Sequence, residues 1–145
     1  MKKPAMILFV ILSIVLTTEI SSAEINFEAI KQIESSGFAD ALNPRTQARG
    51  LYGITSICLK DFNRLTKNHF KHSDLDIIWI NRAIAEWYFK RRIPQLLKAR
   101  RKPATLRNLL ISYNAGHTWV SKNKLPKETR NYITKYERLA HEKVS

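Results

Sequence analysis

The chain has 145 residues, which is enough for one compact domain with its own core but not for two. It is strongly basic, with 25 Lys and Arg against 12 Asp and Glu, so its partner is expected to be anionic: nucleic acid, an acidic membrane surface or a cell-wall polymer. The single cysteine, Cys58, excludes an internal disulfide and lies between apolar neighbours, where we expect a buried structural thiol.

The N-terminal segment predicts export. Lys2 and Lys3 precede an almost wholly apolar run over residues 5–16, and polar residues then lead to the small residues Ser21, Ser22 and Ala23. This order is typical of a secretory signal peptide, and the run is shorter than the roughly 20 residues of a membrane-spanning helix. We therefore expect residues 1–23 to be a cleaved signal peptide and residues 24–145 to be the exported domain; a retained membrane anchor is the alternative. Export argues against nucleic acid as the partner.

Amphipathic spacing along the rest of the chain predicts a mostly helical domain. Asn26 is a candidate cap for a first helix that Gly37 would end, and residues 38–53 are predicted to form a loop. Residues 74–98 carry a second helical pattern, a third includes Tyr113, and Pro126 begins a fourth. The side chains expected to face the core are Phe27, Ile30, Ile77, Ile80, Ile84, Trp87, Tyr88, Leu106, Leu109, Leu110, Tyr132, Ile133, Tyr136 and Leu139.

Glu34 falls on the apolar stripe of the first predicted helix, seven residues after Phe27. Burial in apolar surroundings raises the pKa of a carboxyl group, which suits a general acid working near neutral pH. The alternative is a Glu at a helix end that turns to solvent. No second carboxylate lies in a recognisable motif; Asp40 and Asp61 are the nearest in sequence.

Four short motifs follow one another along the chain. They are Glu34-Ser35-Ser36, Gly50-Leu51-Tyr52-Gly53-Ile54, Ser112-Tyr113-Asn114-Ala115-Gly116 and Leu125-Pro126-Lys127-Glu128-Thr129-Arg130-Asn131-Tyr132-Ile133. Over about residues 27–136, the set resembles the soluble lytic transglycosylase family, which cuts the glycan strands of bacterial peptidoglycan. The resemblance implies a single lysozyme-like helical domain, of the goose-type or SLT architecture, with a substrate groove.

The resemblance also implies roles for individual residues. Glu34 matches the family's catalytic acid and base, and Tyr132 matches a tyrosine near that carboxylate. Tyr113 would form an aromatic wall of the groove, and Asn114 would bond the substrate's N-acetyl group. The residues expected to bind substrate are Ser35, Gly50, Leu51, Tyr52, Tyr113, Asn114 and Ala115.

The second motif departs from the family, which has a Gln where this chain has Gly53. The family's Gln helps to shape the groove, so the replacement puts substrate grip in doubt. We expect Tyr52 to compensate by stacking on a sugar ring. A turn glycine beside a core tyrosine is the alternative interpretation of this segment.

The activity that the resemblance implies is cleavage of the β-1,4 bond between N-acetylmuramic acid and N-acetylglucosamine with formation of 1,6-anhydromuramyl products. One Glu would protonate the leaving oxygen and then take the proton of the sugar's own C6 hydroxyl. A hydrolytic muramidase of the goose-lysozyme type, or a weakly active peptidoglycan-binding protein, is the alternative.

We expect no cofactor and no metal site, because His69 and His72 lack further ligands at a suitable spacing. The expected partner is the peptidoglycan glycan strand, and the family also works beside cell-envelope secretion or pilus machinery. A monomer in the periplasm, or at the cell wall or outside the cell, is the expected state. A basic cluster over residues 90–102 either contacts the anionic partner or forms an ordinary solvated face.

Overall fold

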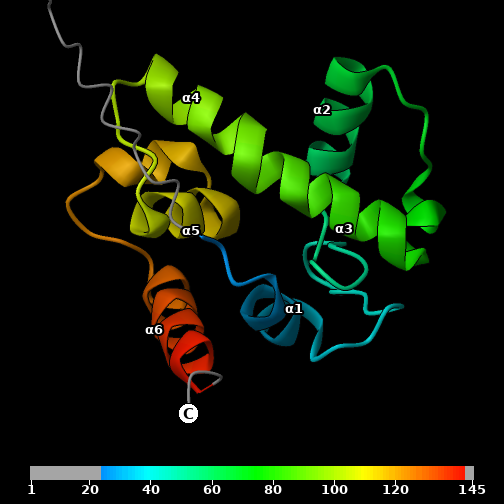
Figure 1. The fold of residues 1–145 in the computed structure, drawn as a ribbon, viewed down its shortest axis with the longest axis horizontal. Coiled ribbons are helices and arrows are strands. Elements are labelled where there is room, and N and C mark those ends of the chain that lie inside the picture. The colour runs from blue at the N-terminus through cyan, green and yellow to red at the C-terminus, as the bar shows by residue number, and fades with distance from the viewer. Residues whose placement is uncertain (1–23, 143–145) are drawn as a thin grey trace, which may run out of the picture.

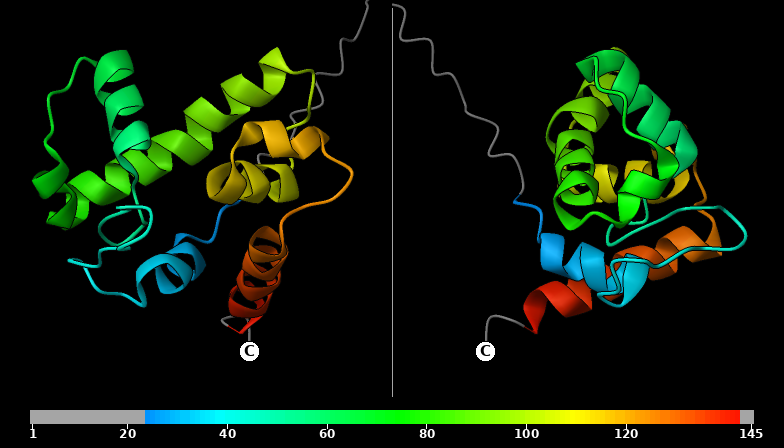
Figure 2. Two further views of the ribbon diagram at one scale, coloured as in Figure 1. Left: turned by 180° about the vertical axis from the view of Figure 1, so that it is seen from behind. Right: turned by 90° about the vertical axis from the view of Figure 1, so that its right-hand side faces the viewer.

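A computed structural model of the chain describes residues 24–142, and the predicted signal peptide with its cleavage after Ala23 lies outside these residues. The described part is a bundle of helices joined by loops (Figures 1 and 2), which confirms the mostly helical prediction. None of the helices in this part is long and apolar enough to cross a membrane. In chain order the elements are α1 (Phe27–Ser35), α2 (Ser56–Thr66), the 3-10 turn η1 (His72–Asp76), α3 (Ile78–Trp87), the π-helical turn η2 (Tyr88–Arg92), α4 (Ile93–Ala99), α5 (Leu106–Ala115), the 3-10 turn η3 (His117–Ser121) and α6 (Lys127–His141).

A long rod made of α3, η2 and α4 crosses the molecule (Figure 1). It begins at Ile78 rather than at the predicted residue 74, because Ile77 is extended and η1 precedes it. Ile77 is 44% exposed, so its predicted place in the core was wrong. The rod widens into a π turn just before Pro94, where the Ile93 N–H bonds the Tyr88 carbonyl five residues back. Proline cannot donate a backbone hydrogen bond, so a local change of helical winding here is expected.

Helices α1, α5 and α6 pack together on one side of this rod, and α2 lies on the other (Figure 2). The Asn26 side chain accepts a hydrogen bond from the Ala29 N–H at 3.1 Å, so the predicted cap of α1 is confirmed. The Asn26 N–H donates to the Tyr136 hydroxyl at 2.8 Å, which ties the start of α1 to α6. Helix α1 ends at Ser35, and its cap Ser36, in the left-handed region at φ 53°, directly precedes Gly37, the predicted stop.

The loop between α1 and α2 is held to both sides of the molecule. Two isolated bridges, Leu42 with Arg49 and Arg49 with Ile54, fold it back on itself. The Arg49 guanidinium binds the Asp76 carboxylate beside α3, with an Nε to Oδ1 distance of 2.6 Å. Arg45 pairs with Glu128 at the start of α6 at 3.1 Å. The segment predicted as a loop is therefore a loop with a defined conformation. This conformation places the glycine motif beside the end of α1.

The buried core runs between the rod and the helices on either side of it. Cys58 is buried, as expected, and burial raises the pKa of its thiol. Most of the side chains predicted to face the core are buried; Phe27, Trp87, Tyr88, Leu106 and Leu139 are only partly buried and pack against it. The buried ones among those predicted are Ile30, Ile80, Ile84, Leu109, Leu110, Tyr132, Ile133 and Tyr136.

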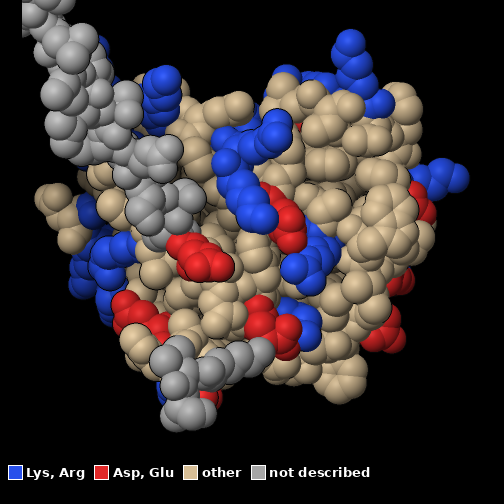
Figure 3. All heavy atoms as spheres, viewed as in Figure 1, with Lys and Arg blue, Asp and Glu red and all other residues tan. Residues whose placement is uncertain are grey.

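The positive charge does not form one uniform field. Basic and acidic side chains alternate over the middle of the face in Figure 3. Within the predicted basic cluster, Lys90 pairs with Glu86 at 3.2 Å and Arg92 pairs with Asp61 at 2.6 Å. Part of this cluster is thus engaged in ion pairs within the domain.

Candidate active site

Glu34 lies in the last turn of α1 and is half-buried. Burial raises the pKa of its carboxyl group to about 7, and the negative charge of Glu128 acts in the same direction. A carboxyl with this pKa is a mixture of acid and base at neutral pH, so it can give up a proton and take it back. The local sequence and the fold together place an acid–base group at this point.

The Tyr132 hydroxyl from α6 lies beside the Glu34 carboxyl, as the resemblance implies. It is buried and has no hydrogen bond of normal length and angle, yet its interaction with the carboxylate lowers the pKa of Glu34 against the larger effect of burial. Burial and the neighbouring charge of Glu34 raise the pKa of Tyr132 itself, so its phenol stays protonated. Tyr132 therefore acts on Glu34 as a neutral dipole that favours the ionised carboxylate.

Replacement of Tyr132 by Phe is expected to raise the pKa of Glu34, because the interaction that lowers it is lost. A general acid works while protonated, so the alkaline limb of the kcat/KM profile should move to higher pH. The measurement is the pH dependence of peptidoglycan cleavage for both proteins. No hydrogen bond of normal geometry is lost, so the thermal midpoint should hardly change. A limb that stays in place, or moves to lower pH, would contradict the assigned contact.

Gly53 lies directly against the Glu34 carboxylate. A Cβ atom added to Gly53 would come within 2.5 Å of Glu34 Oε2 and 3.1 Å of its Cδ. The backbone at Gly53 also has φ +61°, a region that side chains rarely adopt. A Gln side chain, as the family has, would therefore not fit at this position. In this chain the Gly53 backbone lies against the candidate acid Glu34 instead.

The change Gly53→Ala is expected to reduce cleavage at least about tenfold, because the new methyl must displace the Glu34 carboxyl from its place. A matched control is Gly37→Ala, at φ +89° with only the Gln32 Nε2 atom within 4 Å of the added Cβ, at an ordinary contact distance of 3.6 Å. Both changes strain the backbone by about 1 kcal/mol, but only the first meets the carboxylate. Equal losses of activity in the two variants would argue against the contact with Glu34.

The glycine motif is held in place by Asn81 of α3, a residue that the sequence analysis did not single out. Asn81 is fully buried; its Oδ1 accepts from the Tyr52 N–H at 2.8 Å, and its Nδ2 donates to the Arg49 and Leu75 carbonyls at 2.9 Å each. Gly50 lies against this amide, since a Cβ there would come within 2.1 Å of Asn81 Nδ2. One signal was available: Asn81 falls at helical spacing between Ile77 and Ile84, where an apolar residue is expected.

Tyr52 belongs to the core. Its side chain is only 3% exposed and packs edge-on against Phe27, with ring centroids 6.0 Å apart. An enclosed ring has no free face for a sugar, so the expected stacking of Tyr52 on substrate was wrong. The alternative interpretation, a core tyrosine, is the correct one. Gly50 and Leu51 of the same motif are buried as well, and they shape the backbone beside Glu34.

Tyr113 connects the third motif to this backbone. Its hydroxyl donates to the Tyr52 carbonyl at 2.5 Å, and its ring stacks on Phe89 at a centroid distance of 4.3 Å. Burial, and next the charge of Glu34, raise the pKa of Tyr113. Asn114 and Ala115 are half-buried at the end of α5, and their contacts with substrate stay predictions.

Ser35 helps to end α1. Its hydroxyl donates to the Lys31 carbonyl at 3.0 Å and accepts from the Gly37 N–H at 3.1 Å. The side chain thereby stabilises the helix end that presents Glu34. A contact of Ser35 with substrate stays a prediction.

The structure brings together Glu34, Tyr132, Gly53 and Tyr113 from four separate segments. It also adds Glu128, whose charge acts on Glu34 although no role was predicted for it. Of the two acids considered from sequence, Asp61 is engaged by two arginines, while the carboxylate whose charge raises the pKa of Glu34 is Glu128. Among residues 24–142 no group of three or more His, Cys, Asp or Glu side chains could hold a metal ion.

Comparison with known proteins gives a family match. The model of the family described as "Transglycosylase SLT domain" matches residues 16–135. This range contains all four sequence motifs and every residue of the site described above. No curated protein and no solved structure matches the chain.

Proposed function

The chain belongs to the transglycosylase SLT domain family, and from this premise we propose that it is an exported lytic transglycosylase of peptidoglycan. Family membership supports a lytic-transglycosylase type of activity on peptidoglycan. Our finer proposal is that the enzyme cleaves the β-1,4 bond between N-acetylmuramic acid and N-acetylglucosamine and leaves a 1,6-anhydromuramyl end.

The observation that carries this proposal is the single carboxyl of Glu34 with its pKa near 7. Glycosidases that use two carboxylates need both beside the scissile bond. The other carboxylate that acts on Glu34 is Glu128, which is exposed and paired with Arg45. A mechanism with one acid–base group fits this arrangement better than one that requires a second carboxylate.

The proposed reaction uses Glu34 twice. The protonated carboxyl first donates its proton to the glycosidic oxygen as the C1–O4 bond breaks. The O6 atom of the same muramyl residue then bonds to C1, and its hydroxyl proton passes to the Glu34 carboxylate. The carboxyl ends protonated, and no water is consumed.

Mass spectrometry of the fragments released from purified peptidoglycan tests the proposal. The expected products end in 1,6-anhydromuramyl residues and are lighter by one water than hydrolysed fragments. Because Glu34 must start as the acid, release should fall as the pH rises through about 7. Only hydrated, reducing ends would contradict the proposal.

Hydrated products would instead identify a hydrolytic muramidase of the goose-lysozyme type, the second candidate, which shares the single Glu. A third candidate, a weakly active binding protein, is motivated by Gly53 at the position of the family's Gln. It predicts retention on peptidoglycan without release of soluble fragments, unchanged by replacement of Glu34.

Export to the periplasm, or to the cell wall or beyond, is proposed from the N-terminal segment alone. N-terminal sequencing of the protein recovered from the periplasmic fraction tests it, with Glu24 as the expected first residue. A monomer acting on glycan strands, alone or beside cell-envelope secretion or pilus machinery, completes the proposal. Sedimentation of the purified protein tests the monomer.

A further inference from the structure

Outside the candidate active site, a pocket of about 550 Å³ lies between α2, the rod and the end of α5, with charged side chains set around a mostly apolar wall. Helix α2 contributes Lys60, Asp61 and Arg64 to it, and η2 contributes Arg92. Pockets of this size hold small molecules or a few residues of a peptide. None of the roles assigned above accounts for these four charged side chains.

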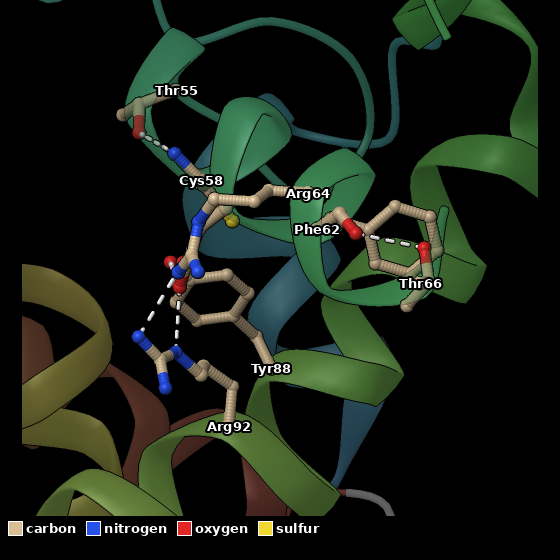
Figure 4. Close-up of polar contacts among 8 residues, drawn as sticks. Thr55, Cys58, Phe62, Arg64, Thr66, Tyr88 and Arg92 are labelled. Carbon is tan, nitrogen blue, oxygen red and sulfur yellow. Dashed lines mark hydrogen bonds and ion pairs between the residues drawn. The ribbon is translucent and has the colours of Figure 1, made fainter. Parts of the chain in front are cut away.

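Asp61 organises the basic side chains of this pocket. Figure 4 shows the Arg64 and Arg92 side chains converging from α2 and η2 beside Tyr88. One Asp61 oxygen accepts from Arg64 at 2.6 Å, and the other accepts from Arg92 at 2.6 Å and from the Tyr88 hydroxyl at 3.3 Å. A single carboxylate fixes two guanidinium groups, so their remaining N–H donors are held in place.

The pocket has a surplus of positive charge. Lys60, Arg64 and Arg92 carry three positive charges against the single negative charge of Asp61. The positive charge also affects His117, which lines the same pocket. Burial is the larger cause that lowers the pKa of His117, and the charges of Arg100 and Arg92 lower it further. Such a pocket favours an anionic group, and the planar guanidinium groups suit a carboxylate or a phosphate.

The pocket adjoins the candidate active site. Ser112 of α5 and Gly116, which caps this helix, line it, and they flank Tyr113 and Asn114 of the third motif. Tyr113 is close enough to Glu34 for the charge of that carboxylate to raise its pKa, after the larger effect of burial. A substrate bound at the end of α5 would therefore have its neighbouring groups within reach of Arg64 and Arg92.

We propose that this pocket binds a carboxylate of the stem peptide that branches from the glycan strand. The proposal rests on the function proposed above, since it takes peptidoglycan as the substrate. The sugars of the strand are neutral where the lactyl group carries a peptide, so the anionic groups near the cleaved bond belong to that peptide. The apolar part of the wall, Ile57, Ile93 and Leu96, can contact its aliphatic side chains.

Calorimetric titration of the whole protein with a free stem tripeptide tests the pocket without any cleavage. The peptide should bind, and the same peptide with its carboxylates amidated should bind at least about fivefold more weakly. Arg64→Gln and Lys60→Gln should each weaken binding about fivefold or more, with Lys60→Gln leaving the Asp61 network intact. The matched control is Lys135→Gln on the exposed surface of α6, which should bind as the original protein does.

Absent binding, equal affinity for the amidated peptide, or an equal loss in Lys135→Gln would overturn the proposal. Displacement of the peptide by inorganic phosphate at equal concentration would overturn it in favour of a phosphate site, and displacement by glycan chains without peptide in favour of a sugar subsite.

The cleavage assay separates this inference from the proposed function. Peptide binding without release of anhydro fragments would support the peptide pocket and contradict the transglycosylase reaction. The converse result is release of anhydro fragments at equal rates from strands with and without stem peptides, while no peptide binding is found. That result would support the transglycosylase reaction and contradict the peptide pocket.

Discussion

Replacement of Glu34 by Gln is expected to lower the release of anhydro fragments by at least about a thousandfold, because one carboxyl serves as both acid and base. The amide has nearly the same shape but can neither donate an acidic proton nor accept the proton of the C6 hydroxyl. Mass spectrometry of the fragments, run beside the original protein at equal concentration, gives the measurement. Substantial residual release would show that another group carries the chemistry.

The thermal stability of Glu34→Gln serves as a control, and the pKa of Glu34 predicts the direction in which it changes. The folded-state pKa of Glu34 is raised from 4.5 to about 7, so the carboxyl contributes most to stability at low pH, and this contribution falls as the pH rises between these values. The uncharged Gln lacks this effect. At about pH 8 the thermal midpoint of Glu34→Gln should therefore equal or exceed that of the original protein. A clearly lower midpoint would mean that the loss of activity reflects unfolding.

Replacement of Asn81 by Ala is expected to cost about 3 to 5 kcal/mol of unfolding free energy, because three backbone groups each lose a hydrogen bond at once. These are the Tyr52 N–H and the Leu75 carbonyl, whose bonds to Asn81 are buried, and the part-buried Arg49 carbonyl, which keeps its bond from the Ile54 N–H. The Asn81 side chain is fully buried, so these bonds are made away from solvent. Urea unfolding of both proteins, followed by circular dichroism, gives the measurement.

Asn63→Ala is the matched control for this change. The Asn63 side-chain amide on α2 also makes two hydrogen bonds to backbone: its Nδ2 donates to the Phe70 carbonyl at 2.8 Å, and its Oδ1 accepts from the Phe70 N–H at 3.2 Å. Asn63 is only half-buried. It should cost about 1 to 2 kcal/mol and leave activity intact. Asn81→Ala should also reduce activity in the fraction that stays folded, since Gly50 and Gly53 would shift beside Glu34. Equal effects of the two variants would contradict the role of Asn81.

The helices could be predicted because their signals are local. Asn26 caps α1 as predicted, and the stripe of Phe27, Ile30 and Glu34 faces inward with a pKa of Glu34 near 7. The order of the four motifs led to the family that the comparison confirms. The single lysozyme-like helical domain follows from the same match and from the helical structure.

The errors arose where distant segments decide the outcome. Tyr52 was expected to face a sugar, but Phe27 covers its ring. Ile77 fits the helical pattern but falls before the rod begins. The charge of Glu128 on Glu34 depends on how α6 approaches α1, which no periodicity reports.

The sequence by itself determined four of the helical segments, which face of each is apolar, and which carboxyl lies on such a face; it did not single out α2. Each of these depends on neighbours within a turn or two of the chain. Only the tertiary structure decided that Gly53 meets the carboxylate of Glu34, that the Tyr132 hydroxyl faces it, and that Asn81 holds the glycine motif between them. These contacts join residues far apart in sequence, and their existence depends on the path of the loop and on packing between helices. Neither leaves a repeating pattern in the chain.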